Sequence, residues 1–397
     1  MKQISLIASA ALLLASCSGG SGKEGSSAGE THVDLHHRDS VLLAEGLIYY
    51  GHDPQEAAFD DMYYAFLASE KDMNKASAKA LEEFKAKVAA MSDQERAFLK
   101  GVFTDYAYLA DMANYAYKDS EVAIPHGWID LSAKDEKLTK IIERYTMSDG
   151  VPTGLKCSLM GNGNRKVLVF AGTDFPESWK KARQVMDFII DAYEDVNGAL
   201  KEDASQFMQA CYLVDELFAA GYVSKDNLEF AGHSLGGRLA SEMAVQYNCP
   251  AVLFNAAGVF PDVYDSYEEA RKGADENWRG YIVDIISAND PLTCAQKYMS
   301  GESDPFVSTA AKALDIDKST MEGLLSLAGA VVDKVAGDTQ VVSSIKGAAS
   351  SYGNIVDEYY ERDYRALGAK MPIREDMAGH GVKELAAALR ARAALCE

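Results

Sequence analysis

The stretch GHSLGG at residues 232–237 decides the fold, because it puts a serine at a turn between two different elements. The apolar pair Phe230-Ala231 precedes it and a helical run from Leu235 to Tyr247 follows, so Ser234 is predicted at a sharp strand-to-helix turn. Glycines two positions before and after Ser234 remove the clash that side chains would make in such a strained turn. The same G-x-S-x-G pattern occurs at residues 25–29, but no strand or helix is predicted around it, so we discount that match.

Helices and strands alternate around this turn. Strands are predicted where short apolar runs are bounded by turn residues, and helices where apolar residues recur every three or four positions. The predicted strands cover residues 154–160, 165–171, 227–231, 250–258, 281–288 and 369–373, and the predicted helices cover residues 204–220, 235–247 and 382–395. This alternation indicates an α/β fold with a mostly parallel central sheet flanked by helices.

Two longer segments are predicted to be helical throughout. Residues 40–103 form a helical N-terminal extension, in which Ser92 and Glu95 make a capping box before an apolar run. Residues 300–367 form a helical insert before the last predicted strand. The insert is either a lid over a site or a set of packing helices, and the sequence favours neither reading. Shorter helices are predicted at residues 106–117 and 130–145.

The first residues resemble an export signal. The positively charged Lys2 is followed by an apolar run from Ile4 to Ala15, which is too short to span a bilayer. The segment Leu14–Cys17 resembles the lipobox of bacterial lipoproteins, in which the signal is cleaved before a cysteine that then carries lipid. We therefore expect a signal peptide at residues 1–16, a lipid-attached Cys17 and a flexible tether over residues 17–39. This predicts a lipid-anchored protein of the cell envelope, at the outer membrane of a Gram-negative bacterium.

The composition narrows the classes of partner. The 397 residues carry a formal net charge of −21, with 48% hydrophobic and 25% charged residues. These proportions are typical of a globular chain, and the negative charge argues against nucleic acid as a partner, because phosphate binding needs clustered Lys and Arg. The six cysteines are widely spaced and match no zinc pattern, so we expect mostly buried free thiols and neither a metal nor a cofactor.

A nucleophilic Ser234 needs a base, and the base needs an acid to orient it. In enzymes with this type of turn, the acid and then the histidine follow the serine along the chain. Of the seven histidines only His380 follows Ser234, and it lies between two glycines in a predicted loop. Asp290 follows an apolar strand, at the strand end where catalytic groups of α/β sheets gather. Asp262 is the second choice for the acid, whereas Asp284 lies inside its strand.

The negative oxygen that forms during ester cleavage needs hydrogen-bond donors. The backbone N–H of Leu235, at the start of the helix, is one candidate. Thr173 follows the apolar strand 165–171, and its N–H and hydroxyl are the second candidate. An ordinary turn at the end of the strand is the alternative reading of that position.

Several segments together resemble the class 3, or fungal-type, lipase family of the α/β-hydrolase fold. Residues 230–240 are similar to the nucleophile elbow of that family, and residues 169–174 are similar to its oxyanion strand. Residues 287–292 resemble its acid loop, and residues 106–117 resemble its opening helix. His380 takes the place of its late histidine.

The resemblance covers residues 104–397, which we predict to be a hydrolase domain behind the helical extension at residues 40–103. The sequence departs from the family at Ala171, where arginine is usual. The resemblance implies metal-free hydrolysis of acyl esters, and thus a lipid or acyl-ester substrate, with Thr173 as the oxyanion residue.

The predicted reaction is a two-step acyl transfer by a lipase- or carboxylesterase-like serine hydrolase. Ser234 attacks a carboxylic ester, His380 shuttles the proton and Asp290 orients the imidazole. A thioesterase or peptidase could use the same three residues, because one fold hosts many acyl transfers. A surface-binding lipoprotein that has lost catalysis is a further alternative, although all three candidate residues are present.

Overall fold

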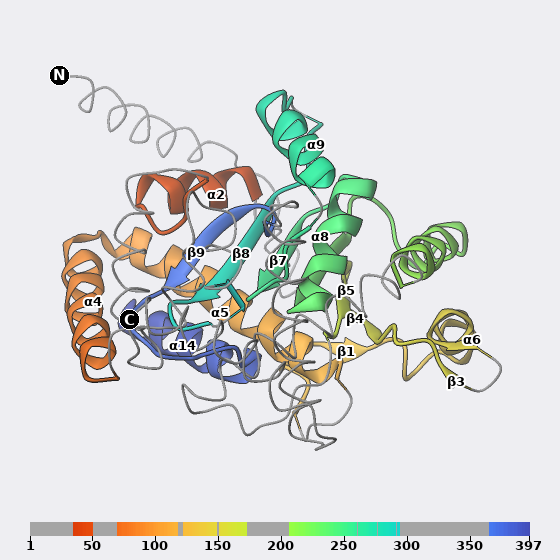
Figure 1. Cartoon of the computed structure of the whole chain (residues 1–397), viewed down its shortest axis with the longest axis horizontal. Coiled ribbons are helices and arrows are strands. Elements are labelled where there is room, and N and C mark those ends of the chain that lie inside the picture. The colour runs from red at the N-terminus through yellow and green to blue at the C-terminus, as the bar shows by residue number, and fades with distance from the viewer. Residues whose placement is uncertain are drawn as a thin grey trace, which may run out of the picture. The chain divides into compact units, whose positions relative to one another are not determined.

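A mixed seven-stranded sheet lies at the centre of the protein (Figure 1). In the computed structural model its strand order is β1-β4-β5-β6-β7-β8-β9, and a separate pair joins β2 to β3. The pairs β1–β4 and β4–β5 are antiparallel, and strands β5 to β9 run parallel, which confirms the predicted mostly parallel sheet. The strands are β1 (Ile129–Asp130), β2 (Met147–Ser148), β3 (Val151–Pro152), β4 (Cys157–Asn162), β5 (Arg165–Phe170), β6 (Leu228–His233), β7 (Ala251–Phe254), β8 (Ile282–Ser287) and β9 (Ala369–Ile373).

The structure describes residues 35–50, 70–117, 122–148, 151–172, 206–259, 261–275, 277–290, 292–293 and 365–397. All of them belong to one unit, Leu35–Glu397. The predicted signal peptide, residues 17–34 of the predicted tether and residues 300–364 of the predicted insert lie outside the described residues. Residues 35–39 of that tether begin the helix α2 (Leu35–Ala44), in which Arg38 and Asp39 are buried, so the body starts earlier than predicted. Within the described ranges no helix is both long and apolar enough to cross a bilayer.

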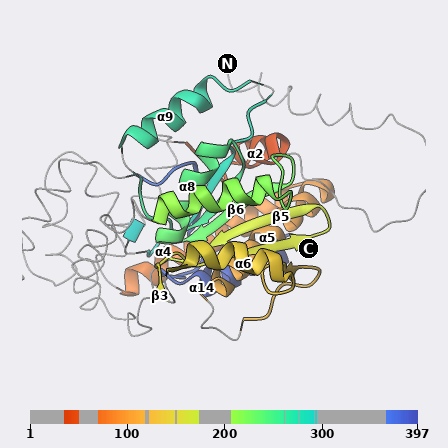
Figure 2. The same cartoon turned by 90° about the vertical axis from the view of Figure 1, so that its right-hand side faces the viewer.

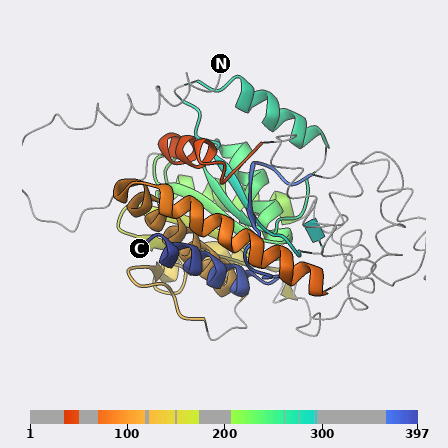
Figure 3. The same ribbon diagram turned by 90° about the vertical axis from the view of Figure 1, so that its left-hand side faces the viewer.

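Helices cover both faces of the sheet. One face carries α6 (Glu136–Thr146), a helix over residues 206–219, α8 (Leu235–Tyr247) and α9 (Pro261–Lys272), and Figure 2 shows α6 and α8 on that side. The other face carries α5 (Asp93–Tyr115) and α14 (Val382–Leu395), which share their core with α2 (Leu35–Ala44) and α4 (Glu70–Ala90). Figure 3 shows α14 in blue beside the orange N-terminal helices.

Side chains of the central strands alternate between these two cores. In β5, Val167 and Val169 join the core shared with α5 and α14, whereas Leu168 and Phe170 join the core shared with α8. All four side chains are fully buried. Because both faces are covered there, the four residues 167–170 are all apolar instead of alternating with polar residues.

The predicted limits of α8, β9 and α14 are confirmed. The strand predicted at residues 250–258 is shorter and ends at Phe254, because Asn255 adopts a left-handed backbone conformation with φ 44°. The helix predicted at residues 130–145 begins only at Glu136. Both differences lie at element ends, where local backbone geometry decides the boundary.

The predicted capping box begins α5. The Ser92 hydroxyl accepts a hydrogen bond from the N–H of Glu95, and the Glu95 carboxylate accepts one from the N–H of Ser92. The helix then runs unbroken to Tyr115, so the helix predicted at residues 106–117 is its second half. The predicted division between an extension ending at residue 103 and a domain starting at residue 104 therefore falls inside α5, and that division stays a prediction.

Candidate active site

Ser234 lies at the junction of β6 and α8, where the chain turns sharply. Its backbone has φ 57° and ψ −127°, a strained conformation for a residue with a side chain. Four backbone hydrogen bonds hold it. The Ser234 N–H donates to the carbonyl of Phe254 at 3.1 Å, and the Ser234 carbonyl accepts from the N–H groups of Gly237 at 2.9 Å, Ala257 at 3.0 Å and Arg238 at 3.2 Å. The Ser234 hydroxyl is buried and has no hydrogen-bond partner among the described residues.

Glycines let the backbone approach closely around this turn. A Cβ atom on Gly232 would lie 2.1 Å from the carbonyl oxygen of Gly236. One on Gly236 would lie 2.3 Å from the carbonyl oxygen of Phe170, at the end of β5. Real Cβ atoms do not make such contacts, so only glycine fits at either position. The G-x-S-x-G pattern is therefore required by packing as well as by the turn itself.

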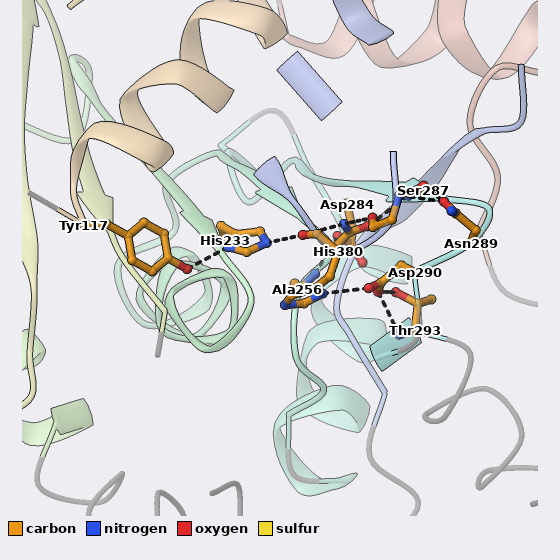
Figure 4. Close-up of polar contacts among 11 residues, drawn as sticks. Tyr117, His233, Ala256, Asp284, Ser287, Asn289, Asp290, Thr293 and His380 are labelled. Carbon is orange, nitrogen blue, oxygen red and sulfur yellow. Dashed lines mark hydrogen bonds and ion pairs between the residues drawn. The ribbon is translucent and has the colours of Figure 1, made fainter. Parts of the chain in front are cut away.

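His380 and Asp290 form a pair at the carboxyl end of the parallel strands (Figure 4). The distance between His380 Nδ1 and Asp290 Oδ1 is 2.6 Å, and the two side chains are 12% and 0% exposed. The other oxygen of Asp290 accepts hydrogen bonds from the N–H of Thr293, at 2.8 Å, and from the Thr293 hydroxyl. Asp290 is thus fixed from both sides and presents one oxygen to the imidazole.

The loop that carries His380 is held by two asparagines that the sequence analysis missed. The Asn289 side-chain oxygen accepts a hydrogen bond from the N–H of Gly379 at 2.6 Å. The Asn255 amide donates to the carbonyls of Gly379 at 2.9 Å and His380 at 3.2 Å. Asn255 and Asn289 follow the ends of β7 and β8, and that location was the available signal in the sequence.

The His380 loop also contacts the turn that carries the serine. The rings of His380 and His233, the residue before Ser234, have centroids 4.7 Å apart. Ser234, Asp290 and His380, which lie far apart in the sequence, therefore gather at one edge of the sheet. The bonded pair is His380 and Asp290, and the Ser234 turn lies at the same edge of the sheet.

Comparison of the sequence with known proteins shows which family the chain belongs to. Residues 106–350 match the model of a phospholipase-like family, described as the Tle-like phospholipase domain. The chain belongs to this family. An extracellular phospholipase A1 from Serratia liquefaciens is 36% identical over 108 residues, which make up 27% of this chain and 28% of that protein. The chain therefore matches less than a third of the length of that relative.

Membership of the phospholipase-like family supports the expected hydrolysis of lipid esters. The matched range, residues 106–350, includes Ser234 and Asp290, and His380 follows it. The expected lipase character is thus confirmed at the level of a lipase or phospholipase family. The class 3 subtype stays a prediction.

The two other acids considered from the sequence lie elsewhere. Asp284 is fully buried inside β8, where it accepts hydrogen bonds from Lys370 Nζ at 3.1 Å and from the N–H of Ala256 at 3.3 Å. Burial raises the pKa of the Asp284 carboxyl above its ordinary value, and the adjacent Lys370 offsets only part of that rise. Asp262 belongs to α9. Asp290 bonds to His380, as the sequence predicted for the acid.

The predicted oxyanion donors are only partly described. Leu235 is the first residue of α8, so its N–H lies at a helix N-terminus, where partial positive charge favours an anion. Thr173 lies outside the described residues, as does the predicted lipid-attachment residue Cys17. Gly172 precedes Thr173, and a Cβ atom on it would come within 2.9 Å of the Ser234 Cβ. The end of β5 therefore lies directly beside the serine.

Cysteines and metal-ligating groups add no further site in the part of the chain that the structure describes. No group of three or more His, Cys, Asp or Glu there could hold a metal ion. The prediction of buried free thiols is confirmed for Cys249 and Cys396, Cys211 is free and half-buried, and Cys157 is buried.

Proposed function

We propose that the protein is a serine hydrolase of the α/β-hydrolase fold that cleaves a carboxylic ester of a lipid through Ser234, His380 and Asp290. The observation that carries the proposal is the 2.6 Å bond between His380 and Asp290 at the same sheet edge as the strained Ser234 turn. A buried histidine–carboxylate pair beside a serine on a strained turn supports nucleophilic acyl transfer, in which the histidine activates the serine.

The reaction proceeds in two steps. His380 accepts the proton of the Ser234 hydroxyl as the serine oxygen attacks the ester carbonyl, and Asp290 stabilises the resulting imidazolium. The N–H of Leu235 and the N–H and hydroxyl of Thr173 stabilise the tetrahedral oxyanion. His380 then returns the proton to the alcohol that leaves, and water hydrolyses the acyl-enzyme by the reverse sequence of proton transfers.

A glycerophospholipid is the substrate class that the comparisons favour. The family model is that of a phospholipase-like domain, and the Serratia relative is a phospholipase A1. We propose that one acyl ester of such a lipid is cleaved, as in the class 3 lipases that residues 230–240 and 287–292 resemble.

The test uses the full chain in mixed micelles with phospholipids that carry a different fatty acid at each glycerol position. Mass spectrometry of the released fatty acids gives both the activity and the position. We expect the wild type to release one fatty acid in preference to the other, and the Ser234→Ala variant to release none. Hydrolysis of acyl-thioesters or peptides without any release from phospholipid would contradict a lipid esterase.

The membrane anchor is a separate proposal. The lipobox-like segment Leu14–Cys17 supports cleavage before Cys17 and attachment of lipid to it, which would locate the protein in the cell envelope. Intact-mass measurement of the protein from a Gram-negative host should give the mass of residues 17–397 plus lipid. A Cys17→Ser variant should lack the lipid and leave the membrane fraction. An unmodified Cys17 in the wild type would refute the anchor.

A further inference from the structure

A chain of hydrogen bonds runs from the end of α5 to the backbone of the candidate base (Figure 4). The Tyr117 hydroxyl lies 2.7 Å from Nδ1 of His233, and Nε2 of His233 lies 2.7 Å from the carbonyl oxygen of His380. These bonds join residues that are 116 and 147 positions apart. His233 is adjacent to the nucleophile but takes no part in the acyl transfer described above.

The chemistry of the partners fixes the direction of each bond. A backbone carbonyl can only accept, so Nε2 of His233 must carry the hydrogen and donate to His380. In a neutral ring Nδ1 is then the acceptor, and the Tyr117 hydroxyl donates to it. Burial, reinforced by the nearby His380, lowers the pKa of His233 to about 3, so the ring is neutral at physiological pH. His233 is therefore held in one tautomer by its two partners.

Tyr117 also lies beside the nucleophile. A Cβ atom built on Gly172 would meet both the Tyr117 hydroxyl oxygen and the Ser234 Cβ at 2.9 Å. The tyrosine hydroxyl, the end of β5 and the serine turn therefore share one small space. The ring centroids of Tyr117 and His233 are 5.9 Å apart, so the two side chains are in contact as well as hydrogen-bonded.

We propose that Tyr117 and His233 are positioning residues for the base of the proposed triad. His233 anchors the backbone carbonyl of His380, while Asp290 anchors its imidazole, so that both ends of the residue are fixed relative to Ser234. The His380 carbonyl requires the hydrogen on Nε2 of His233, and the Tyr117 hydroxyl supports that tautomer by donating to Nδ1. Asn255 donates to the same carbonyl at 3.2 Å, so the 2.7 Å bond from His233 is the shorter of the two.

This role rests on the proposed function and predicts a specific kinetic effect. A positioning residue acts on the chemical step, so its loss lowers kcat and leaves KM for a small soluble ester unchanged. Removing the Tyr117 hydroxyl should lower kcat about fivefold, the equivalent of one neutral hydrogen bond. Removing both bonds with His233→Leu should lower kcat roughly tenfold or more.

The experiment is a double-mutant cycle on Tyr117→Phe and His233→Leu, with kcat and KM measured on a short-chain aryl ester. The same samples are titrated with a fluorophosphonate, so that kcat is expressed per reactive serine. His233→Gln is included because its amide can still donate to the His380 carbonyl, and it should recover part of the loss. Tyr115→Phe is the matched control, since the Tyr115 hydroxyl donates to Asp130, away from the site.

The proposal predicts that the double variant has the kcat of His233→Leu alone, because Tyr117 acts only through His233. Three results would overturn it. The losses of kcat in the two single variants could multiply in the double variant, Tyr117→Phe could have the same kcat as Tyr115→Phe, or the substitutions could raise KM instead of lowering kcat. If the wild type neither reacts with the fluorophosphonate nor cleaves the ester, the proposed function itself fails and this role falls with it. A reactive wild type with an unaffected Tyr117→Phe variant would remove only the positioning role.

Discussion

At the edge of the sheet where the parallel strands end, the neutral side chains of His233, Asn255 and Asn289 bind backbone atoms of the His380 loop. At the edge where the strands begin, which we call the charged edge, Arg165 forms ion pairs with Asp105 and Glu229. Strand β6 belongs to both edges, because Glu229 lies near its start and Ser234 follows its end. Near the start of β6, Arg165 bonds to Glu229 and to Asp105, at 2.6 Å in each case.

The charged edge also holds the first described helix. Arg38 in α2 pairs with Asp39 at 2.8 Å, and its guanidinium lies 5.5 Å from the centre of the Tyr106 ring. Burial raises the pKa of Asp39, and the positive charge of Arg38 opposes that effect. Such pairs need not add stability overall, but losing one partner leaves an isolated buried charge.

The two edges of the sheet therefore have different roles, one in positioning reactive groups and the other in stability. Strained backbone and neutral hydrogen bonds at the strand ends orient reactive groups, and paired charges at the strand starts keep the helices attached. Substitutions at the first edge should change catalysis with little change in stability. Substitutions at the second edge should do the opposite.

The largest expected effect is that of Asp290→Asn. An amide nitrogen facing His380 would hold the imidazole in the wrong tautomer for accepting the serine proton, so kcat should fall about 10,000-fold. The melting temperature should change little, because the amide preserves the shape of the carboxylate. Steady-state kinetics with thermal unfolding of the same sample checks both. A kcat within tenfold of the wild type would mean that Asp290 is not the orienting acid.

The next largest effect is a loss of stability on substitution at the charged edge. Arg38→Met leaves Asp39 without its partner, so the free energy of unfolding at pH 7 should fall by about 3 kcal/mol, with kcat per folded molecule unchanged. Urea unfolding measures the stability. Lys140→Met, which breaks the exposed pair with Glu136, is the control and should change the stability by less than about 1 kcal/mol.

The loss of stability caused by Arg38→Met, measured as the free energy of unfolding, should also depend on pH. Burial already raises the folded-state pKa of Asp39, and loss of Arg38 raises it further. A carboxyl with a raised folded-state pKa binds its proton more tightly when folded, so it destabilises the folded state increasingly as pH rises through that pKa. The difference from the wild type should therefore shrink between pH 7 and pH 5. A difference that grows on acidification would contradict this account of the charged edge.

The strained backbone of Ser234 predicts a smaller effect, in which a substitution raises the free energy of unfolding. Ser234→Gly should be about 1 kcal/mol more stable than Ser234→Ala, because glycine adopts positive φ without a steric penalty. Both variants lack the buried hydroxyl, so their difference isolates the backbone strain. Denaturant unfolding of the two variants is the measurement. Equal stabilities would show that the turn stores no strain at this residue.

The smallest expected effect is that of Thr293→Val. It removes the hydroxyl that donates to Asp290 but retains the donation from the N–H of Thr293, so kcat should fall about fivefold. Thr139→Val is the matched control, because the Thr139 hydroxyl bonds to backbone carbonyls near α6. A larger loss in the control than in Thr293→Val would argue against this support of the acid.

Local patterns in the sequence predicted the elements and much of the site. The glycines and the apolar run after Ser234 predicted helix α8. His380 could be predicted as the base because it is the only histidine that follows Ser234 in the sequence. The roles of Asn255 and His233 were not predictable in this way. Their partners are 124 and 147 residues away in the sequence, and only the folded sheet brings the His380 loop against both. The charged edge depends in the same way on contacts between distant helices and strands.

In the proposed active site Ser234 is a nucleophile that His380 activates. The most direct measurement is labelling of the folded full chain with a fluorophosphonate, followed by peptide mapping of the modified residue, alongside Ser234→Ala and His380→Ala variants. We expect one label, on Ser234, which disappears in the Ser234→Ala variant and forms far more slowly in the His380→Ala variant. A label on another residue, or an equal labelling rate without His380, would contradict the proposed active site.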